Sequence, residues 1–286
     1  MAPKIQWPLV LFSMLAGCGG CAFAFVGLGN IFGAPVEFTL AVTVVSFVLV
    51  VVGGLCSVLH LATPKHALSA ISHLTSFSGI SVELIMLGIV SILMVGYAAS
   101  CVLFDSAMAR LVFGALGIAA GLGLAFATGH GYLISSKPTW NTKKLPLAYT
   151  GTALVSGGLL YAAAASVLSA GQAVLSLAVT VTAVGMVLSA IAVIAYALHL
   201  GKGRLKDNAA LFWGGIVACG IAAPIVLLGV VFAGGVPGAD ALLLIAGFVF
   251  SVVGGICLRM LMWIVGAGFL FFFEEAQANR SVILNV

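Results

Sequence analysis

The chain has 286 residues, of which 63% are apolar and only 6% are charged, and its formal net charge is +4. Soluble globular proteins average about 45–50% apolar and roughly 25% charged residues, so this composition excludes a water-soluble fold. The chain is therefore an integral membrane protein.

Eight apolar segments each reach the roughly 20 residues that a helix needs to cross a bilayer. They use nearly the whole chain, and they are too long for the strands of a membrane barrel. We therefore predict an all-α fold, a single polytopic membrane domain over residues 1–286 that forms a bundle of eight transmembrane helices. The predicted spans are residues 7–32, 36–61, 80–103, 110–134, 146–169, 174–200, 210–233 and 240–273.

Small residues are abundant in these spans, and they predict close helix packing rather than chemistry. The chain has 36 glycines, and Gly117 with Gly121 forms a GxxxG pair of the kind that lets helix backbones approach in lipid. The six cysteines all lie inside the apolar spans or at their ends, and none belongs to a loop cluster with metal-ligand spacing. We therefore expect no metal site in this chain.

Basic residues are concentrated on one side of the predicted membrane, the side that holds both termini. Those on that side are Lys4, Lys65, Lys137, Lys143, Lys144, Lys202, Arg204, Lys206 and Arg280. The other side carries only Arg110, together with acidic Glu37, Asp105 and Asp240. The positive-inside rule then places both termini in the cytoplasm. The same basic loops could also dock an acidic partner protein, and the two explanations are compatible.

Two ionisable residues near the basic side are candidates for proton-coupled chemistry. His60 ends the second predicted helix, and Glu83 lies in the first turn of the third, so both are expected to face one cleft between helices. A quinol that loses two electrons also releases two protons; a histidine can accept one and a carboxylate the other. Arg259, inside the last span, could stabilise an anionic intermediate or keep Glu83 ionised.

Structural explanations compete with each of these assignments. A histidine that ends one helix and a glutamate that begins the next both complement the helix dipole. Arg259 could simply pair with a buried carbonyl or carboxylate. All five histidines belong to the basic side, which argues against a cytochrome with haems near both faces, although a single haem between His60 and His130 is compatible with the count.

Several short motifs resemble the membrane anchor subunit of the dimethyl-sulfoxide reductase family, a relative of the polysulfide-reductase-type anchors. The most specific is Ser57-Val58-Leu59-His60-Leu61, followed by Pro64 and Ala67 and by a serine-rich approach to Glu83. The others are Trp7-Pro8-Leu9, Pro138-Thr139-Trp140 and Arg259 in the last span. This chain departs from the family pattern at Ala62, where glycine is usual, and at His66, where arginine is usual.

The resemblance implies a haem-free anchor in a bacterial or archaeal cytoplasmic membrane that oxidises quinol, commonly menaquinol. It implies that the electrons pass to an iron-sulfur subunit docked on the basic loops, and from there to a catalytic subunit with a molybdenum bis-pterin cofactor. It also implies that His60 and Glu83 line the quinol pocket, with Pro64, His66 and Arg259 as further binding residues. Membrane lipid is the other expected partner, and no nucleic acid is expected.

Two other functions are compatible with the sequence. A secondary transporter would place its substrate near the midplane at broken helices, which Pro224 and glycine pairs could provide. The chain shows no convincing internal repeat, and its ionisable residues gather near one interface. A purely structural anchor that passes no electrons is the third possibility.

Overall fold

The computed structural model describes residues 5–59, 78–234, 236 and 238–283. Within these ranges the chain is helical without strands, and eight helices are long and apolar enough to cross a membrane, which confirms the predicted all-α bundle. The bounds are α1 (Trp7–Ile31), α2 (Val36–Leu59), α4 (Gly79–Val102), α5 (Ala107–His130), α6 (Lys144–Val167), α7 (Gln172–Leu200), the short α8 (Lys202–Asp207), η3 (Ala210–Ala222) with α9 (Ala223–Phe232), and α10 (Asp240–Ile283).

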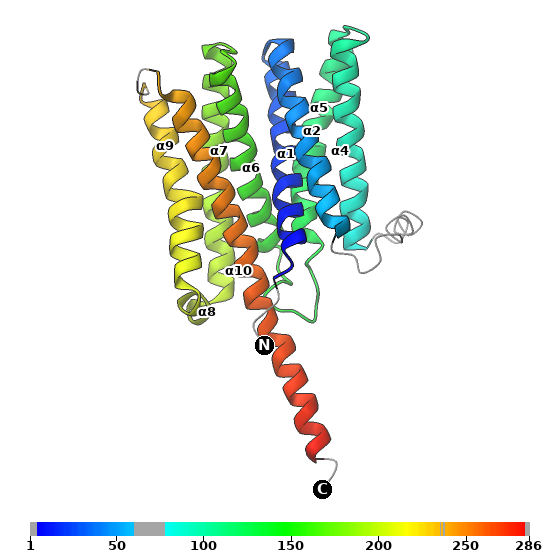
Figure 1. Cartoon of the computed structure of the whole chain (residues 1–286), viewed down its shortest axis with the longest axis vertical. Coiled ribbons are helices and arrows are strands. Elements are labelled where there is room, and N and C mark those ends of the chain that lie inside the picture. The colour runs from blue at the N-terminus through cyan, green and yellow to red at the C-terminus, as the bar shows by residue number, and fades with distance from the viewer. Residues whose placement is uncertain (1–4, 60–77, 235, 237, 284–286) are drawn as a thin grey trace.

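Successive spans run in opposite directions through the bundle (Figure 1). The start of α1, the α5–α6 connection, α8 and the last part of α10 lie at one end. We call this the basic end, because the connection, the start of α6 and α8 carry most of the described Lys and Arg side chains, namely Lys137, Lys143, Lys144, Lys202, Arg204 and Lys206. The opposite end carries the turns between α1 and α2, α4 and α5, α6 and α7, and α9 and α10.

Helix α1 is the central element of the bundle and packs against α2, α5, α6 and α10. Glycines allow its backbone to approach α5 closely. A Cβ added at Gly20 would lie 3.0 Å from the carbonyl oxygen of Gly121, and one at Gly114 would lie 3.2 Å from Cα of Gly27. A side chain at these positions would force the two helices apart. The glycines of α5 therefore allow close helix packing, as the GxxxG pair in the sequence predicts.

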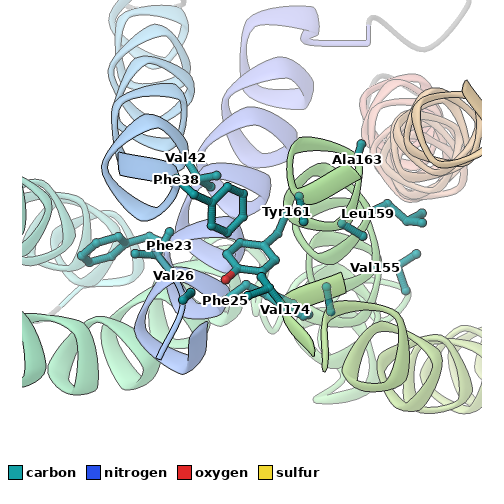
Figure 2. Close-up of a cluster of buried hydrophobic side chains, with 14 of the residues drawn as sticks. Phe23, Phe25, Val26, Phe38, Val42, Val155, Leu159, Tyr161, Ala163 and Val174 are labelled. Carbon is teal, nitrogen blue, oxygen red and sulfur yellow. The ribbon is translucent and has the colours of Figure 1, made fainter. Parts of the chain in front are cut away.

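An aromatic core fills the half of the bundle that lies away from the basic end. Figure 2 shows side chains of α1, α2 and α6 converging around Tyr161. The Tyr161 ring meets Phe38 at a centroid distance of 5.0 Å and Phe25 at 5.7 Å. Rings at this separation contribute attraction beyond the area that they bury. This packing fixes α1, α2 and α6 relative to one another. Because these helices run the length of the bundle, it also helps to position their other ends.

The seventh span changes helix type halfway along its length. Residues Ala210–Ala222 form a π-helix, and Ala223–Phe232 form an α-helix with Pro224 in its first turn. Proline has no backbone N–H to donate, and it lies here directly after the π-helical segment, where the hydrogen-bonding pattern of the helix changes. Pro224 therefore marks a switch of helix type and not an interruption of the span. Long π-helices are rare, and such distortions often occur beside functional sites.

Helix α10 is longer than the sequence predicts. It has 44 residues, ends at Ile283 rather than near residue 273, and extends beyond the rest of the bundle at the basic end (Figure 1). At roughly 1.5 Å per residue its length is about 66 Å, more than twice the thickness of a bilayer's hydrocarbon core. The apolar part that qualifies as a span is Asp240–Gly266.

Candidate functional site

The predicted site residues fall into two groups in the structure. His60, Pro64 and His66 lie outside the described residues, so the expected proximity of His60 to Glu83 stays a prediction. Glu83 on α4 and Arg259 on α10 are both described; Glu83 lies near the start of α4, and Arg259 lies in the later half of the spanning part of α10, Asp240–Gly266.

Glu83 lies one turn further into α4 than the sequence predicts. The helix begins at Gly79, its N-cap is Ser78, and the Ser78 hydroxyl accepts a hydrogen bond from the backbone N–H of Ser81 (3.3 Å). The first turn contains no acidic residue. The stabilising effect of a helix dipole on a carboxylate falls off within that turn, so the dipole alone does not account for Glu83.

The carboxylate of Glu83 packs against the end of α5. A Cβ added at Gly131, the residue that caps α5, would lie 2.8 Å from Oε1 of Glu83. Gly79 approaches the same place, because a Cβ added there would lie 2.8 Å from Cα of Gly131. The two helix ends therefore meet through glycines. The missing side chain at position 131 provides the space that the half-buried Glu83 carboxylate occupies.

His130 is the last residue of α5 and adjoins this contact. Its Nδ1 is buried and has no hydrogen-bond partner among the described residues, and its ring lies 6.0 Å from that of Phe126. A buried ring nitrogen without a partner is costly, because water would otherwise satisfy it. His130 therefore offers a donor or an acceptor, according to its tautomer, one residue before the Gly131 contact.

Four aromatic side chains form a cluster next to Glu83 at the basic end. The Tyr132 ring makes edge contacts with Trp140 (5.5 Å), Trp263 (5.9 Å) and Tyr149 (6.0 Å), and the two tryptophan rings are 5.0 Å apart. Trp140 is anchored by a 2.8 Å hydrogen bond from Nε1 to the carbonyl oxygen of Met262 on α10. The α5–α6 connection is thereby fixed to the last span. We call Tyr132, Trp140, Tyr149 and Trp263 the aromatic cluster.

Burial shapes the electrostatics of the α5–α6 connection. Desolvation raises the pKa of Tyr132 well above its ordinary value, and Tyr149 and Glu83 act in the same direction. Tyr132 is therefore a neutral phenol. Burial also lowers the pKa of Lys137, whose ammonium lies 3.6 Å from the centre of the Trp140 ring. A cation over an indole face is attracted by the electrons of the ring.

Arg259 is fully buried, and its guanidinium is held by neutral oxygen atoms. Its Nε donates to the hydroxyl of Ser13 (2.9 Å); one terminal nitrogen donates to Thr152 Oγ1 (3.2 Å) and the carbonyl of Gly255 (2.9 Å), and the other to the carbonyl of Ser13 (3.2 Å). The one side-chain ion pair within the described residues joins Arg110 to Asp105 at the opposite end. Arg259 is therefore a fixed positive charge without a carboxylate partner in that part of the chain.

Tyr149 packs against Arg259. The guanidinium carbon of Arg259 is 4.3 Å from the centre of the Tyr149 ring, and the phenol is also within electrostatic reach of Glu83. The Tyr149 hydroxyl and Trp263 Nε1 are buried without hydrogen-bond partners among the described residues. The structure therefore brings Glu83, His130, the aromatic cluster and Arg259 to one region, with several unpaired polar atoms.

Sequence reasoning missed most of the aromatic cluster. Trp140 was singled out as part of a motif, whereas Tyr132, Tyr149 and Trp263 lie on the α5–α6 connection, α6 and α10 and share no local pattern. The available signal was their position, since aromatic residues beside basic loops are typical of the membrane interface. Among the described residues, no three His, Cys, Asp or Glu side chains gather closely enough to hold a metal ion.

The chain matches the model of a known family. The family model described as DMSO reductase anchor subunit (DmsC) matches residues 1–210, a range that contains Glu83, His130 and three members of the aromatic cluster. Arg259 and Trp263 lie beyond the matched range. No curated protein matches the chain in sequence.

Proposed function

Because the chain belongs to the DMSO reductase anchor subunit family, we propose that it oxidises membrane quinol at its basic end and passes the electrons to an iron-sulfur subunit. The family places the chain in the membrane as the anchor of a molybdenum and iron-sulfur oxidoreductase complex. The observation that supports a quinol site is the half-buried Glu83 carboxylate against Gly131, at the end of the bundle that also holds the unpaired His130 and Tyr149 atoms.

Each group at this site has a role in the proposed reaction. Oxidation of one quinol to quinone releases two electrons and two protons. The Glu83 carboxylate accepts one proton from a quinol hydroxyl, and His60 accepts the other. Pro64 and His66 complete the pocket. Proton transfer to positioned groups of this kind accelerates reactions by roughly 10²- to 10⁴-fold.

Arg259 has an electrostatic role in this proposal. Its guanidinium lies against the Tyr149 ring and is held by four hydrogen bonds, so it cannot swing away from the site. A fixed positive charge favours the anionic quinol that remains after the first proton leaves, and a prearranged charge needs no reorganisation during the reaction. Arg259 therefore acts on the quinol at a distance, through the field that it creates.

The electrons leave through the basic end. Lys202, Arg204 and Lys206 on α8, with Lys143 and Lys144 at the start of α6, present positive charge there. Such a surface suits an iron-sulfur subunit with an acidic docking face, which then passes electrons to the molybdenum bis-pterin subunit.

We further propose that the chain carries no haem and that it uses menaquinol. We also propose that both termini lie on the cytoplasmic side of a bacterial or archaeal inner membrane.

The proposal is tested by mild-detergent purification of the chain with its native complex. Mass spectrometry, together with iron, molybdenum and haem assays, should find an iron-sulfur subunit and a molybdenum subunit without haem. A quinol analogue should then bind the complex and block its quinol-driven turnover. Stable docking without analogue binding would instead support a purely structural anchor. A chain recovered alone, without metal or quinone, would favour the transporter, for which neither the fold nor the family match provides support.

A further inference from the structure

A polar cavity of ≈ 270 Å³ lies at the opposite end of the bundle from the proposed quinol site. It is formed where α7 begins, α9 ends and α10 begins. Its polar lining comprises Gln172, Ser176 and Thr180 of α7 and Asp240 of α10, while Val179 and Phe232 contribute apolar walls. The cavity therefore lies at the depth where a bilayer changes from headgroups to hydrocarbon.

Asp240 is the single charged side chain that lines this cavity. Its Oδ1 is buried and has no hydrogen-bond partner among the described residues. A buried carboxylate oxygen without a partner is costly, and a hydrogen-bonding cation would relieve that cost. The cavity is therefore complementary to a small group that is positively charged and can donate hydrogen bonds.

The first turn of α7 also lines this cavity. Helix α7 begins at Gln172, and its N-cap, Gly171, provides no side-chain cap. The first backbone N–H groups of an uncapped helix need acceptors from outside the helix, and they favour negative charge. Ser176 and Thr180, one and two turns further along, add hydroxyl donors. A ligand with both a cation and an anion in its polar part would satisfy both features.

An apolar groove continues from this cavity along the outside of the bundle. It has a volume of ≈ 310 Å³, lies between α7 and α9, and shares Val179 and Phe232 with the polar cavity. Ala183, Met186 and Leu228 line its deeper part. Its rim faces the surrounding lipid, since Phe232 is 71% exposed. A polar cavity that opens into a lipid-facing apolar groove matches a lipid's headgroup and acyl chain.

We propose that this cavity and groove bind one phospholipid with a primary ammonium headgroup, of the phosphatidylethanolamine class. The ammonium donates to Asp240, the phosphate accepts from the start of α7, and one acyl chain lies between α7 and α9. A choline headgroup has no N–H to donate to Asp240. A glycerol headgroup lacks the positive charge. The site therefore selects lipids whose headgroup carries a cation that can donate hydrogen bonds.

Native mass spectrometry of the purified complex, titrated separately with phosphatidylethanolamine, phosphatidylcholine and phosphatidylglycerol, tests this site. We expect retention of one phosphatidylethanolamine in preference to the other two lipids. Asp240→Asn should weaken that binding by about tenfold, the size of a lost charge-assisted hydrogen bond. The matched control is Glu37→Gln, which removes an acidic side chain from the first turn of α2 at the same end of the bundle. Equal retention of all three lipids, or equal loss in both variants, would overturn the proposal.

A second pair of variants tests the groove independently of Asp240. Gly229 lines the groove, and a Cβ added there would meet no atom within 4 Å. Gly229→Leu should therefore fill the groove without disturbing the helix and abolish lipid retention. Gly214→Leu is the control, because Gly214 belongs to the same span and is equally open but lies outside the groove. Undiminished retention in Gly229→Leu would contradict the proposal. Quinol-driven turnover reports on the other end of the bundle, so the two proposals can fail separately.

Discussion

The carboxylate of Glu83 lies against Gly131, and the space that it occupies exists because position 131 has no side chain. The contact joins the beginning of α4 to the end of α5, where Gly79 also meets Gly131. A carboxylate held this way has a defined position although no described side chain pairs with it. Gly131 thus makes room for the Glu83 carboxylate, and Gly79 allows the two helix ends to meet.

Gly131→Ala should reduce quinol-driven turnover by roughly ten- to hundredfold, because a small displacement of a catalytic group is costly. The new Cβ would lie 2.8 Å from Oε1 of Glu83, so the carboxylate must move. Because this carboxylate is the end of a flexible side chain, its displacement should cost little stability. The measurement is turnover with a quinol donor compared with turnover driven by a dye that reduces the catalytic subunit directly.

Gly88→Ala is the matched control for that variant, since a Cβ added at Gly88 of the same helix meets nothing within 4 Å. It should leave both activities unchanged. If Gly131→Ala retained full quinol-driven turnover, the position of the Glu83 carboxylate would be irrelevant to the reaction.

Arg259→Ala should destabilise the protein by on the order of 3 kcal/mol, because it removes four hydrogen bonds and leaves a cavity in a fully buried site. Arg259→Lys should retain the charge and part of the stability, and with them part of the quinol-driven turnover. Thermal unfolding in detergent, followed by circular dichroism, measures the loss. The control is Arg110→Ala, which removes a cation at the opposite end and should leave quinol-driven turnover unchanged. If all these variants had equal melting temperatures, Arg259 would have no structural role.

Charge reversal on α8 should weaken attachment of the iron-sulfur subunit. Lys202→Glu combined with Lys206→Glu places negative charge on the proposed docking surface, and we expect about tenfold weaker binding that falls further as salt is added. Co-purification at low and high salt measures the effect. The control is Arg110→Glu, which reverses a charge at the opposite end and should leave the partner bound. If the partner were lost both from this variant and from the α8 variant, the effect would not be local to the basic end.

Reporter fusions should reveal the orientation of the chain. Alkaline phosphatase, which is active only outside the cytoplasm, should be inactive when fused at Val286 and active when inserted in the turn at residues 103–106. The physical reason is the excess of Lys and Arg at the basic end, which is expected to remain in the cytoplasm. The reverse pattern would place the basic end, and any subunit docked there, outside the cytoplasm.

The sequence predicts the fold well because hydropathy and length determine where a helix must cross lipid. It could not predict that α10 continues to Ile283, since a helix that leaves the membrane is no longer constrained by the bilayer's thickness. It also could not predict that residues 210–222 would form a π-helix, because hydropathy and length do not distinguish a π-helical span from an α-helical one.

The site was predictable only in part. Glu83 stands out because carboxylates are rare in membrane spans. Its contact with Gly131, and the neutral oxygen partners of Arg259, arise from residues that are distant in the chain, such as Ser13 and Thr152. No local pattern connects these positions. The unpaired atoms of His130 and Tyr149 likewise become visible only once the helices are packed.

The most direct test of the quinol-oxidising role is the turnover of Glu83→Gln in the intact complex. Glutamine keeps the size of the side chain but cannot accept a proton as a carboxylate does. We predict a loss of at least about a hundredfold in quinol-driven turnover, with normal assembly and normal dye-driven turnover, and the same result for His60→Ala. Quinol-driven turnover at the normal rate in both variants would contradict the proposed site.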